Sequence, residues 1–422
     1  MRKVRLGLLG LGTVGCGIIK LLEENGEMIR RREGIDIEVT RILVRDTTRT
    51  RGAEVPAGLL TTKAKDILAD DAIDIVAECM GGEDPAFALL MEALAQGKSV
   101  VTANKEVVAK HWDELEEAAA RSGAGLYYEA SVGGAIPVLN AIRTSLQANH
   151  VSRIMGIING TTNYILSRMS HEGSEYQDAL DGAQRLGYAE PDPTADVAGY
   201  DARYKLSILT ALAFHNRVKV DDIFCQGITG ITPEDIKNAR DLGYVIKLLA
   251  IGKNHDGTVE ARVHPTLIPR DHPLASVEDS FNAVFVEGNM SGSLMFYGRG
   301  AGDLPTASAM VSDILTAARC GGHHQRTILD NEKVRIEENW KSAYYLRLIV
   351  QDRPGVFAEI AEIFGRHGVS LSSVVQTTRE QKQATILIIT HMAEESSINA
   401  VREELKGSRS VISRGSLLRV EE

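Results

Sequence analysis

A short acidic segment followed by an apolar stretch carries the residue types best suited to acid–base chemistry. Asp201 and Lys205 stand four residues apart where a helix is expected to begin, so their side chains share one helix face. Such a pair is commonly an exposed surface ion pair. It is also the pattern of a general acid–base lysine whose proton is held by a carboxylate, in a site lined by Glu190 and Asp196. The residues alone leave both interpretations open.

This acidic group favours a substrate that bears both an ammonium and a hydroxyl group. Glu190 offers a charge-assisted acceptor for the ammonium, and Lys205 offers an acid–base group for the hydroxyl. A hydride acceptor in one domain and such a lysine in another are sufficient for an alcohol dehydrogenase that needs no zinc.

A glycine-rich turn near the N-terminus has the spacing of a dinucleotide-binding loop, GxGxxG, between an apolar strand and an apolar helix. Glycines there allow a tight turn, close approach of a pyrophosphate and close helix packing, while the helix N-terminus faces the phosphates. The alternative is a glycine-rich turn without a ligand. The predicted cofactor loop consists of Gly10, Gly12, Thr13, Val14 and Gly15.

The segment after the second expected strand bears on the choice of cofactor. Arg45, with Arg49 and Arg51 close behind, would suit the 2′-phosphate of NADP. Asp46 would instead suit the ribose hydroxyls of NAD, and a solvated loop with incidental arginines is equally compatible. The sequence favours NADP and keeps NAD open.

Strands and helices alternate over residues 4–132, which is typical of a parallel sheet covered on both faces. We predict an α/β chain that begins with a Rossmann-type nucleotide domain at residues 1–134. Its expected strands are residues 4–9, 37–44, 73–78, 99–103 and 125–130, and its expected helices include residues 85–96 and 105–122.

Two further domains are expected. We predict that residues 135–320 form an α+β catalytic and dimerisation domain with a mixed sheet. The last part of this segment, 302–320, is expected to return to the nucleotide domain. A polar linker is expected at 321–342. The tail, 343–422, has the β-α-β-β-α-β order of a ferredoxin-like domain.

Composition narrows the possible partners. The 422-residue chain has a net charge of −10 and no basic stripe, so nucleic acid and membrane surfaces are not expected to bind it. Its four cysteines are widely spaced and form no CxxC pair, which predicts neither a zinc site nor a disulfide framework. A reducing, cytoplasmic location and a small-molecule substrate follow.

The motifs, taken in order, resemble those of homoserine dehydrogenase over essentially the first 320 residues. The segment from Gly187 to Lys205 is the most specific part. The motifs are Gly10-x-Gly12-x-x-Gly15, Thr102-Ala103-Asn104-Lys105, Glu129 to Gly134, Gly156 to Asn163, Glu190 to Lys205, and Gly300-Ala301-Gly302.

The resemblance implies interconversion of L-homoserine and L-aspartate 4-semialdehyde with NAD(P), on the route to threonine, isoleucine and methionine. It makes Lys205 the proton donor and acceptor and Asp201 its partner. It makes Glu190 a substrate ligand and places Lys105 between nicotinamide and substrate; Asp196, which lines the same site, is expected to bind substrate as well. Gly302 is implied as a further cofactor contact.

The resemblance also implies a site for a monovalent cation, Na⁺ or K⁺. The ligands would be Glu129 and the backbone carbonyls of Val132, Gly134 and Ile136. Oxygen ligands suit a hard cation, and glycines let carbonyls converge. Without the resemblance, a glutamate at a strand end indicates nothing special.

The tail resembles an ACT domain. Asp352, Gly355 and Val356 belong to a loop between a strand and a helix, where the glycine leaves backbone amides open to an effector. The resemblance implies L-threonine as that effector; a dimerisation module without a ligand is the alternative. A homodimer or higher homo-oligomer is expected. A chain ending near Ser342 is expected to stay active and lose inhibition.

Two rival functions must be separated from this one. A cysteine-dependent semialdehyde dehydrogenase would need Cys79 as a nucleophile beside a base, and no such motif is evident. The other rival is a ligand sensor without catalytic activity. The presence of Lys105, Asp201 and Lys205 together argues against it, because a sensor would not need these residues.

Overall fold

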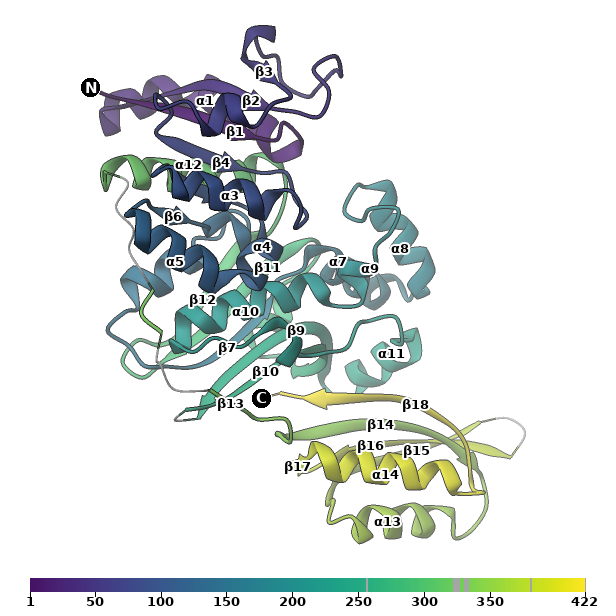
Figure 1. Ribbon diagram of the computed structural model, residues 1–422. Helices are drawn as coiled ribbons and strands as arrows, with labels where there is room; N and C mark the ends of the chain where they lie inside the picture. The colour runs from purple at the N-terminus through teal and green to yellow at the C-terminus, as the bar shows by residue number, and fades with distance from the viewer. Residues whose placement is uncertain (256, 322–326, 330–333, 380–381, 422) are drawn as a thin grey trace. The chain divides into compact units, whose positions relative to one another are not determined.

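The computed structural model (Figure 1) describes residues 1–255, 257–321, 327–329, 334–379 and 382–421. The chain folds into two compact units, and each is built from three separate segments of the sequence. The first comprises Met1–Ile154, Arg203–Ile223 and Asn282–Val334, and the second comprises Met155–Ala202, Phe224–Phe281 and Arg335–Glu422.

A six-stranded parallel sheet forms the centre of the first unit, in the order β3-β2-β1-β4-β5-β6. The order reverses between β1 and β4, and ligands of such sheets bind where the order reverses. The Rossmann prediction is therefore confirmed. The strands are β1 (Arg2–Leu9), β2 (Ile35–Leu43), β3 (Leu60–Thr61), β4 (Ile75–Glu78), β5 (Ser99–Thr102) and β6 (Leu126–Tyr127).

Helices bury the faces of this sheet. Helix α1 (Thr13–Glu33) packs against α12 (Asp303–Arg319), so a segment from late in the chain shares the nucleotide-unit core. Gly17 permits this contact, because a Cβ there would lie 2.5 Å from the Asp303 carbonyl oxygen. The other helices around the sheet are α2 (Lys65–Leu68), α3 (Ala86–Ala95), α4 (Lys105–Lys110) and α5 (Trp112–Ser122).

The single helix predicted at residues 105–122 is wrong, because it is broken at His111 into α4 and α5. The His111 ring stacks on Phe87, with centroids 3.8 Å apart, and its Nε2 lies 2.8 Å from Glu83 Oε1. These tertiary contacts accompany a non-helical backbone at His111. The high helix propensity of the alanines and glutamates in this segment could not predict that break.

The rest of the first unit carries α10, the helix of the acid–base pair. It spans Tyr200–Phe214, so its first three residues belong to the second unit and the remainder to the first. The remaining elements of this part are α6 (Val138–Asn140), a π-helix (Ala141–Ser145), β7 (Val151–Ile157), which crosses between the units, β11 (Phe281–Gly288) and β12 (Gly292–Arg299).

A mixed sheet forms the centre of the second unit, which confirms the predicted sheet class. Strands β9 (Tyr244–His255) and β10 (Thr258–Pro269) pair antiparallel along their whole length, while β8 (Phe224–Cys225) pairs parallel with β10. The helices of this part are α7 (Gly160–Glu172), α8 (Tyr176–Arg185), α9 (Thr194–Val197) and α11 (Pro233–Asp241).

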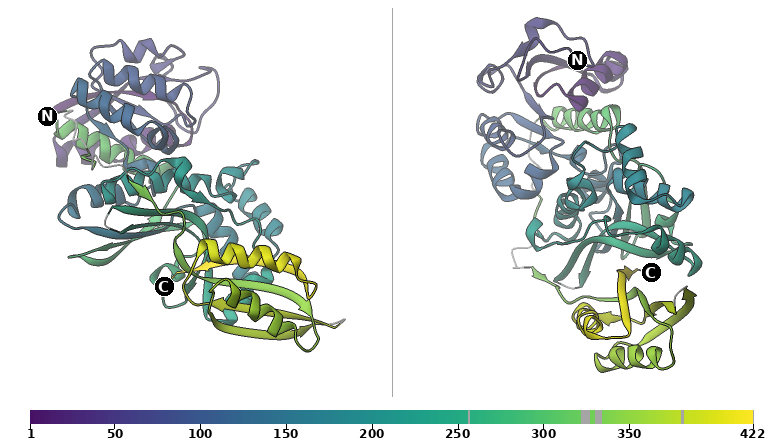
Figure 2. Two further views of the ribbon diagram at one scale, coloured as in Figure 1. Left: turned by 60° about the horizontal axis from the view of Figure 1, so that its bottom comes forward. Right: turned by 90° about the vertical axis from the view of Figure 1, so that its right-hand side faces the viewer.

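The tail forms a ferredoxin-like domain, as predicted. Its two helices lie on one face of the antiparallel sheet (Figures 1 and 2) and bury Ile360, Phe364 and Ile398 against it. The sheet order is β18-β14-β16-β15. The elements are β14 (Lys341–Gln351), α13 (Val356–Arg366), β15 (Leu371–Arg379), β16 (Gln383–Thr390), β17 (Ala393–Glu394), α14 (Glu395–Gly407) and β18 (Val411–Val420).

The tail sheet is continuous with the mixed sheet, because β18 also pairs parallel with β10, Thr266 opposite Arg419. Within the predicted linker, β13 (Arg335–Ile336) also pairs with β10. Residues 322–326 and 330–333 of that linker lie outside the described residues.

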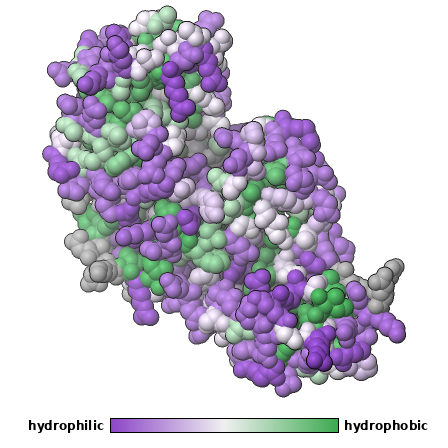
Figure 3. Space-filling model, turned by 45° about the vertical axis from the view of Figure 1, so that its right-hand side comes forward, coloured by the Kyte–Doolittle hydropathy of each residue, from purple (hydrophilic) through white to green (hydrophobic). Residues whose placement is uncertain are grey.

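No helix within the described part of the chain is long and apolar enough to cross a membrane. Hydrophilic residues cover most of the face drawn in Figure 3, and hydrophobic residues form only small groups on it.

Candidate active site

Two of the three glycines in the predicted cofactor loop, Gly10 and Gly15, meet steric requirements, and the third leaves open space. Gly10 has a φ of 104°, and a Cβ at Gly15 would lie 2.4 Å from the Gly10 carbonyl oxygen. A Cβ at Gly12 would instead meet nothing within 4 Å, which leaves the space in front of α1 open. Gly12 is also the N-cap of α1 and provides no side-chain cap, so the first amides of the helix are available to phosphate oxygens. Thr13 and Val14 form the first helical turn.

The adjacent strand ends carry a buried polar cluster that was not predicted. Glu78 ends β4, is fully buried and accepts hydrogen bonds from Thr102 Oγ1 at 2.5 Å and the Met80 amide at 2.7 Å. Burial raises the pKa of this carboxyl group. Asn104 Nδ2 donates to the Gly82 carbonyl at 2.7 Å, which fixes the turn beside the glycine loop.

Cys79, the nucleophile of the rival mechanism, lies in the same turn. Its thiol donates to the Gly10 carbonyl at 3.3 Å, and burial raises the pKa of the thiol. A raised pKa keeps the sulfur protonated and a poor nucleophile, so Cys79 is a packing residue of the glycine loop.

Arg45 lies two residues beyond β2 and its side chain is exposed. The neighbouring Asp46 carboxylate accepts hydrogen bonds from the Thr48 hydroxyl at 2.7 Å and the Thr48 amide at 2.8 Å. These bonds lower the pKa of Asp46. Asp46 is thus engaged by its own loop, whereas Arg45 extends into solvent.

The acid–base pair is buried, which excludes the surface ion pair that the sequence left open. Asp201 is 5% exposed and Lys205 8% exposed, both near the N-terminus of α10. A negative side chain in the first helical turn is favoured by the helix dipole. Lys205 follows one turn later, so a carboxylate and an ammonium share a largely dry helix face.

Asn159 fixes the carboxylates of this site and was not assigned a role from sequence. Its Nδ2 donates to Asp196 Oδ1 at 2.7 Å and to Asp201 Oδ2 at 3.0 Å. Its Oδ1 accepts the Thr162 amide at 2.9 Å and so caps α7. Because the cap occupies the oxygen, the amide nitrogen is presented to both carboxylates. An asparagine before Gly-Thr-Thr at a helix start was the available signal.

Glu190 is exposed, in the loop between α8 and α9, whereas Asp196 is half-buried. Gln184 Nε2 donates to the Glu190 carbonyl oxygen at 3.1 Å and thereby holds the loop backbone. The structure thus brings Asp196 and Asp201 together through Asn159, with Lys205 one helical turn after Asp201, and leaves the Glu190 side chain in solvent.

Lys105 is the first residue of α4, directly after the N-cap Asn104, and is half-buried. The next residue, Glu106, accepts a hydrogen bond from Tyr204 Oη at 3.5 Å. Tyr204 immediately precedes Lys205. The helices that carry the two lysines therefore touch within the first unit.

The predicted cation ligands lie in one loop after β6. Both carboxylate oxygens of Glu129 accept backbone amides, from Leu139 at 3.0 Å and Asn140 at 2.6 Å. Burial, with Asp313 nearby, raises the pKa of Glu129 to about 8. Among the described residues, no group of three or more His, Cys, Asp or Glu side chains forms a metal site.

The carbonyl-bearing part of this loop is shaped by glycine. Gly134 has a φ of 56°, and a Cβ there would lie 2.6 Å from Gly300. The loop of Val132 and Gly134 therefore packs on the Gly300-Ala301-Gly302 turn, whose last residue is the N-cap of α12 with a φ of 127°. The Ile136 carbonyl accepts the Val138 amide at 2.8 Å.

In the tail, the predicted effector loop connects β14 to α13. Gly355 is the N-cap of α13 with a φ of 91°, Asp352 is exposed and Val356 is buried in the domain core. The Asp352 amide donates to the Lys382 carbonyl at 2.8 Å.

A glycine turn at the switch point of a parallel sheet, with a buried lysine on α10 and a ferredoxin-like tail, is the architecture of a nicotinamide-dependent dehydrogenase with an ACT domain. Three family models match the chain. They are the NAD-binding domain of homoserine dehydrogenase at residues 10–129, homoserine dehydrogenase at 137–315, and the ACT domain at 344–408.

Similarity to individual proteins extends over the whole chain. A homoserine dehydrogenase from Corynebacterium glutamicum is 44% identical, covering 99% of this chain and 96% of its own length. The crystal structure of the enzyme from Thiobacillus denitrificans is 41% identical with a TM-score of 0.94, covering 100% of this chain and 99% of that one. A hyperthermophilic archaeal enzyme solved with NADPH is 26% identical with a TM-score of 0.63, covering 76% and 98%. The chain belongs to the homoserine dehydrogenase family and acts on a CH–OH group.

Proposed function

We propose that this enzyme interconverts L-homoserine and L-aspartate 4-semialdehyde with Lys205 as its proton donor and acceptor. The observation that carries the proposal is the burial of Asp201 and Lys205 one turn apart, with Asn159 holding the carboxylate. Low exposure limits hydration of the lysine amine, and a carboxylate one helical turn away can orient that amine.

In homoserine oxidation the neutral Lys205 amine accepts the hydroxyl proton, and in reduction the ammonium returns it to the aldehyde oxygen. The bound nicotinamide supplies the hydride chemistry. Asp196, which Asn159 holds, and Glu190 are the proposed substrate ligands, with the Glu190 carboxylate as the partner of the substrate ammonium group. Lys105, at the start of α4, would lie between the substrate and the nicotinamide.

NADP is the proposed preferred cofactor, held by Gly10, Gly12, Thr13, Val14 and Gly15, with Lys105 and Gly302 as further contacts. Exposed Arg45 supports this preference, because its guanidinium is free to reach a 2′-phosphate while Asp46 is bound to Thr48. The archaeal relative was solved with NADPH.

A monovalent cation, Na⁺ or K⁺, is proposed at Glu129 and the carbonyls of Val132, Gly134 and Ile136. The donor set fits a hard cation, since it is all oxygen, and a bound positive charge would stabilise the buried Glu129 carboxylate. Its role would be to hold the glycine turns together.

L-threonine is the proposed effector of the ACT domain, at Asp352, Gly355 and Val356, in an enzyme of threonine, isoleucine and methionine synthesis in the cytoplasm. A homodimer or higher homo-oligomer is proposed. Exposed Met295 and Tyr297 on β12, the edge strand beside β11, support self-association, because an edge strand with exposed apolar side chains favours pairing with another chain.

The test is homoserine-dependent reduction of NADP and then of NAD, followed by absorbance of the reduced cofactor. We expect turnover with both and a higher kcat/KM with NADP. Phosphate-dependent oxidation of aspartate semialdehyde, without homoserine oxidation, would establish the cysteine mechanism instead. Cofactor binding without any turnover would indicate instead that the protein is a ligand sensor without catalytic activity.

A further inference from the structure

The loop that leads into α10 rests on the turn after β8. The Val197 carbonyl accepts the Ile228 amide at 2.9 Å, and the Ala198 carbonyl accepts the Cys225 thiol at 3.3 Å. A Cβ at Gly227 would lie 2.1 Å from the Val197 carbonyl oxygen, so only glycine permits this approach. The turn after β8 therefore sets where the loop runs.

The same loop carries the proposed chemistry. Asp196 precedes Val197, and Gly199, with a φ of 88°, leads into Asp201. A Cβ on Gly199 would lie 3.0 Å from Cys225 Sγ. The turn after β8 is thus in direct contact with the loop that carries the carboxylates held by Asn159.

The β8 turn is held from the ACT domain. Gln226 lies between Cys225 and Gly227, its amide donates to the Val263 carbonyl at 2.8 Å, and its Oε1 accepts a hydrogen bond from Arg419 Nη1 at 2.7 Å. Arg419 belongs to β18, the last strand of the ACT domain. One side chain therefore connects the tail to the turn that supports the catalytic loop.

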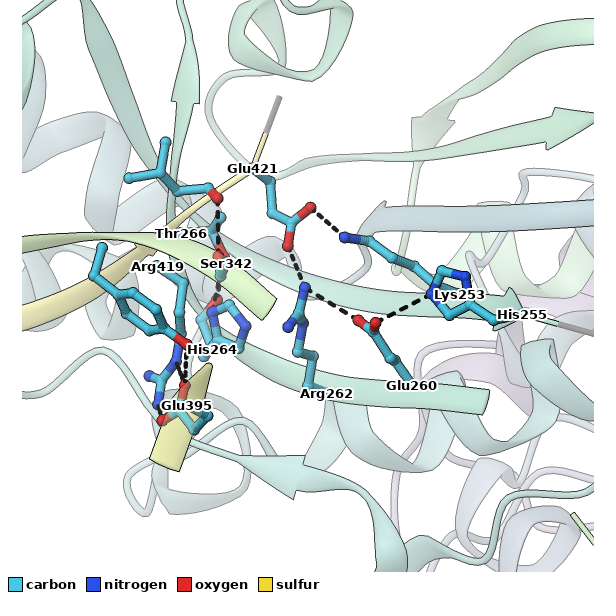
Figure 4. Close-up of polar contacts among 12 residues, drawn as sticks. Lys253, His255, Glu260, Arg262, His264, Thr266, Ser342, Glu395, Arg419 and Glu421 are labelled. Carbon is cyan, nitrogen blue, oxygen red and sulfur yellow. Dashed lines mark hydrogen bonds and ion pairs between the residues drawn. The ribbon is translucent and has the colours of Figure 1, made fainter. Parts of the chain in front are cut away.

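Arg419 is itself fixed within the ACT domain (Figure 4). It is 4% exposed and forms a buried ion pair through two nitrogens with Glu395 at the start of α14. Tyr344 Oη donates to the same carboxylate at 2.9 Å. The guanidinium also lies 4.8 Å from the Phe224 ring centroid, over β8. Its position is determined by α14 and β14, elements far from α10 in sequence.

We infer that Gln226 and Arg419 are positioning residues for the catalytic loop, so that the ACT domain contributes a residue to the support of the active site. The inference rests on the proposed roles of Asp196 and Asp201. A displacement of about 1 Å at reacting groups costs on the order of 100-fold in rate, so loss of one fixed contact is measurable.

The test replaces Gln226 and measures homoserine oxidation by the full-length enzyme. Gln226→Met removes the acceptor at nearly constant volume, and we expect kcat to fall about tenfold while the KM for the cofactor is unchanged. Gln226→Glu keeps an oxygen for Arg419 and should restore most of kcat.

The matched control breaks another contact of the ACT domain that does not lead to this loop. Arg347 on β14 binds Glu234 Oε2 at 2.8 Å on α11, so Glu234→Ala should leave kcat unchanged. The inference would be overturned if Gln226→Met and Glu234→Ala lowered kcat equally, or if Gln226→Glu did not recover kcat. Gln226 would then contribute only to general stability.

A double-mutant cycle with Asp201→Asn separates this inference from the proposed function. If Gln226 acts by placing Asp201, Gln226→Met should lower kcat little further in the Asp201→Asn enzyme. Full additivity would overturn the inference. An unchanged kcat in Asp201→Asn alone would overturn the proposed function, while the Gln226 and Glu234 comparison would still decide the positioning role.

Discussion

Removal of the Glu421 carboxylate should destabilise the second unit strongly, because it leaves a buried cation uncompensated. Glu421 follows β18, and its amide donates to the Leu267 carbonyl at 3.0 Å. Its carboxylate pairs with Arg262 and, at 2.7 Å, with Lys253 Nζ (Figure 4). Arg262 is fully buried, over the Trp340 ring.

The magnitude follows from what remains after Glu421→Ala. The nearest remaining carboxylate for Arg262 is Glu260 at 3.5 Å, and Arg262 Nε and Nη1 have no hydrogen-bond partner within the described part of the chain. Breaking a buried ion pair from one side costs about 3 to 5 kcal/mol. For a unit of roughly 150 to 250 residues, each kcal/mol lowers Tm by about 2 to 4 °C, which gives a fall of roughly 6 to 20 °C.

Thermal unfolding followed by circular dichroism measures this shift. Glu27→Ala is the matched control, because Glu27 pairs with Arg31 at 3.3 Å on an exposed helix face and its loss should leave Tm unchanged. Replacing Arg262 and Glu421 together by Met should recover part of the loss. A fall of less than about 2 °C in Glu421→Ala would refute the reasoning.

The remaining predictions concern substrate, cofactor and pH. Glu190→Gln should weaken homoserine binding by about 1.5 to 3 kcal/mol, and unchanged kcat and KM would make Glu190 structural. Arg45→Ala should raise the KM for NADP selectively, whereas equal effects on NADP and NAD would contradict a 2′-phosphate contact. Burial lowers the pKa of Lys247 from its ordinary 10.5 to about 8, so the free energy of unfolding should rise as the pH increases between these values, because there only the unfolded chain keeps the proton. Urea unfolding of Lys247→Met should lose that rise, and its persistence would contradict the assignment.

The Arg262–Glu421 contact also changes the outcome expected when the tail is removed. From the sequence alone, a chain truncated near Ser342 was expected to stay active. In the structure such a chain would lose β18 from β10 and the carboxylate that neutralises Arg262. We therefore expect the truncated chain to be less stable than the full-length protein.

Local patterns predicted much of the fold. The strand of residues 4–9 and the glycine turn were recognisable because a buried parallel strand is uniformly apolar and the turn needs glycine. The ferredoxin-like order of the tail was readable for a similar reason, since its strands and helices have short, regular periods.

Contacts between distant residues could not be predicted. The helix break at His111 accompanies Phe87 and Glu83, and the pairing of β18 with β10 brings together residues about 150 positions apart. Asn159 was not assigned a role from sequence, because its bonds to Asp196 and Asp201 join residues 37 and 42 positions away. The exposure of Glu190, expected to line the site, depends likewise on a loop conformation.

The measurement that tests the mechanism most directly is the kcat of Lys205→Ala for homoserine oxidation, with NADP binding measured on the same protein. A buried lysine that transfers the proton predicts a fall of at least ~100-fold in kcat with cofactor affinity unchanged. Near-normal turnover in Lys205→Ala would contradict the assignment of Lys205 as the acid–base group.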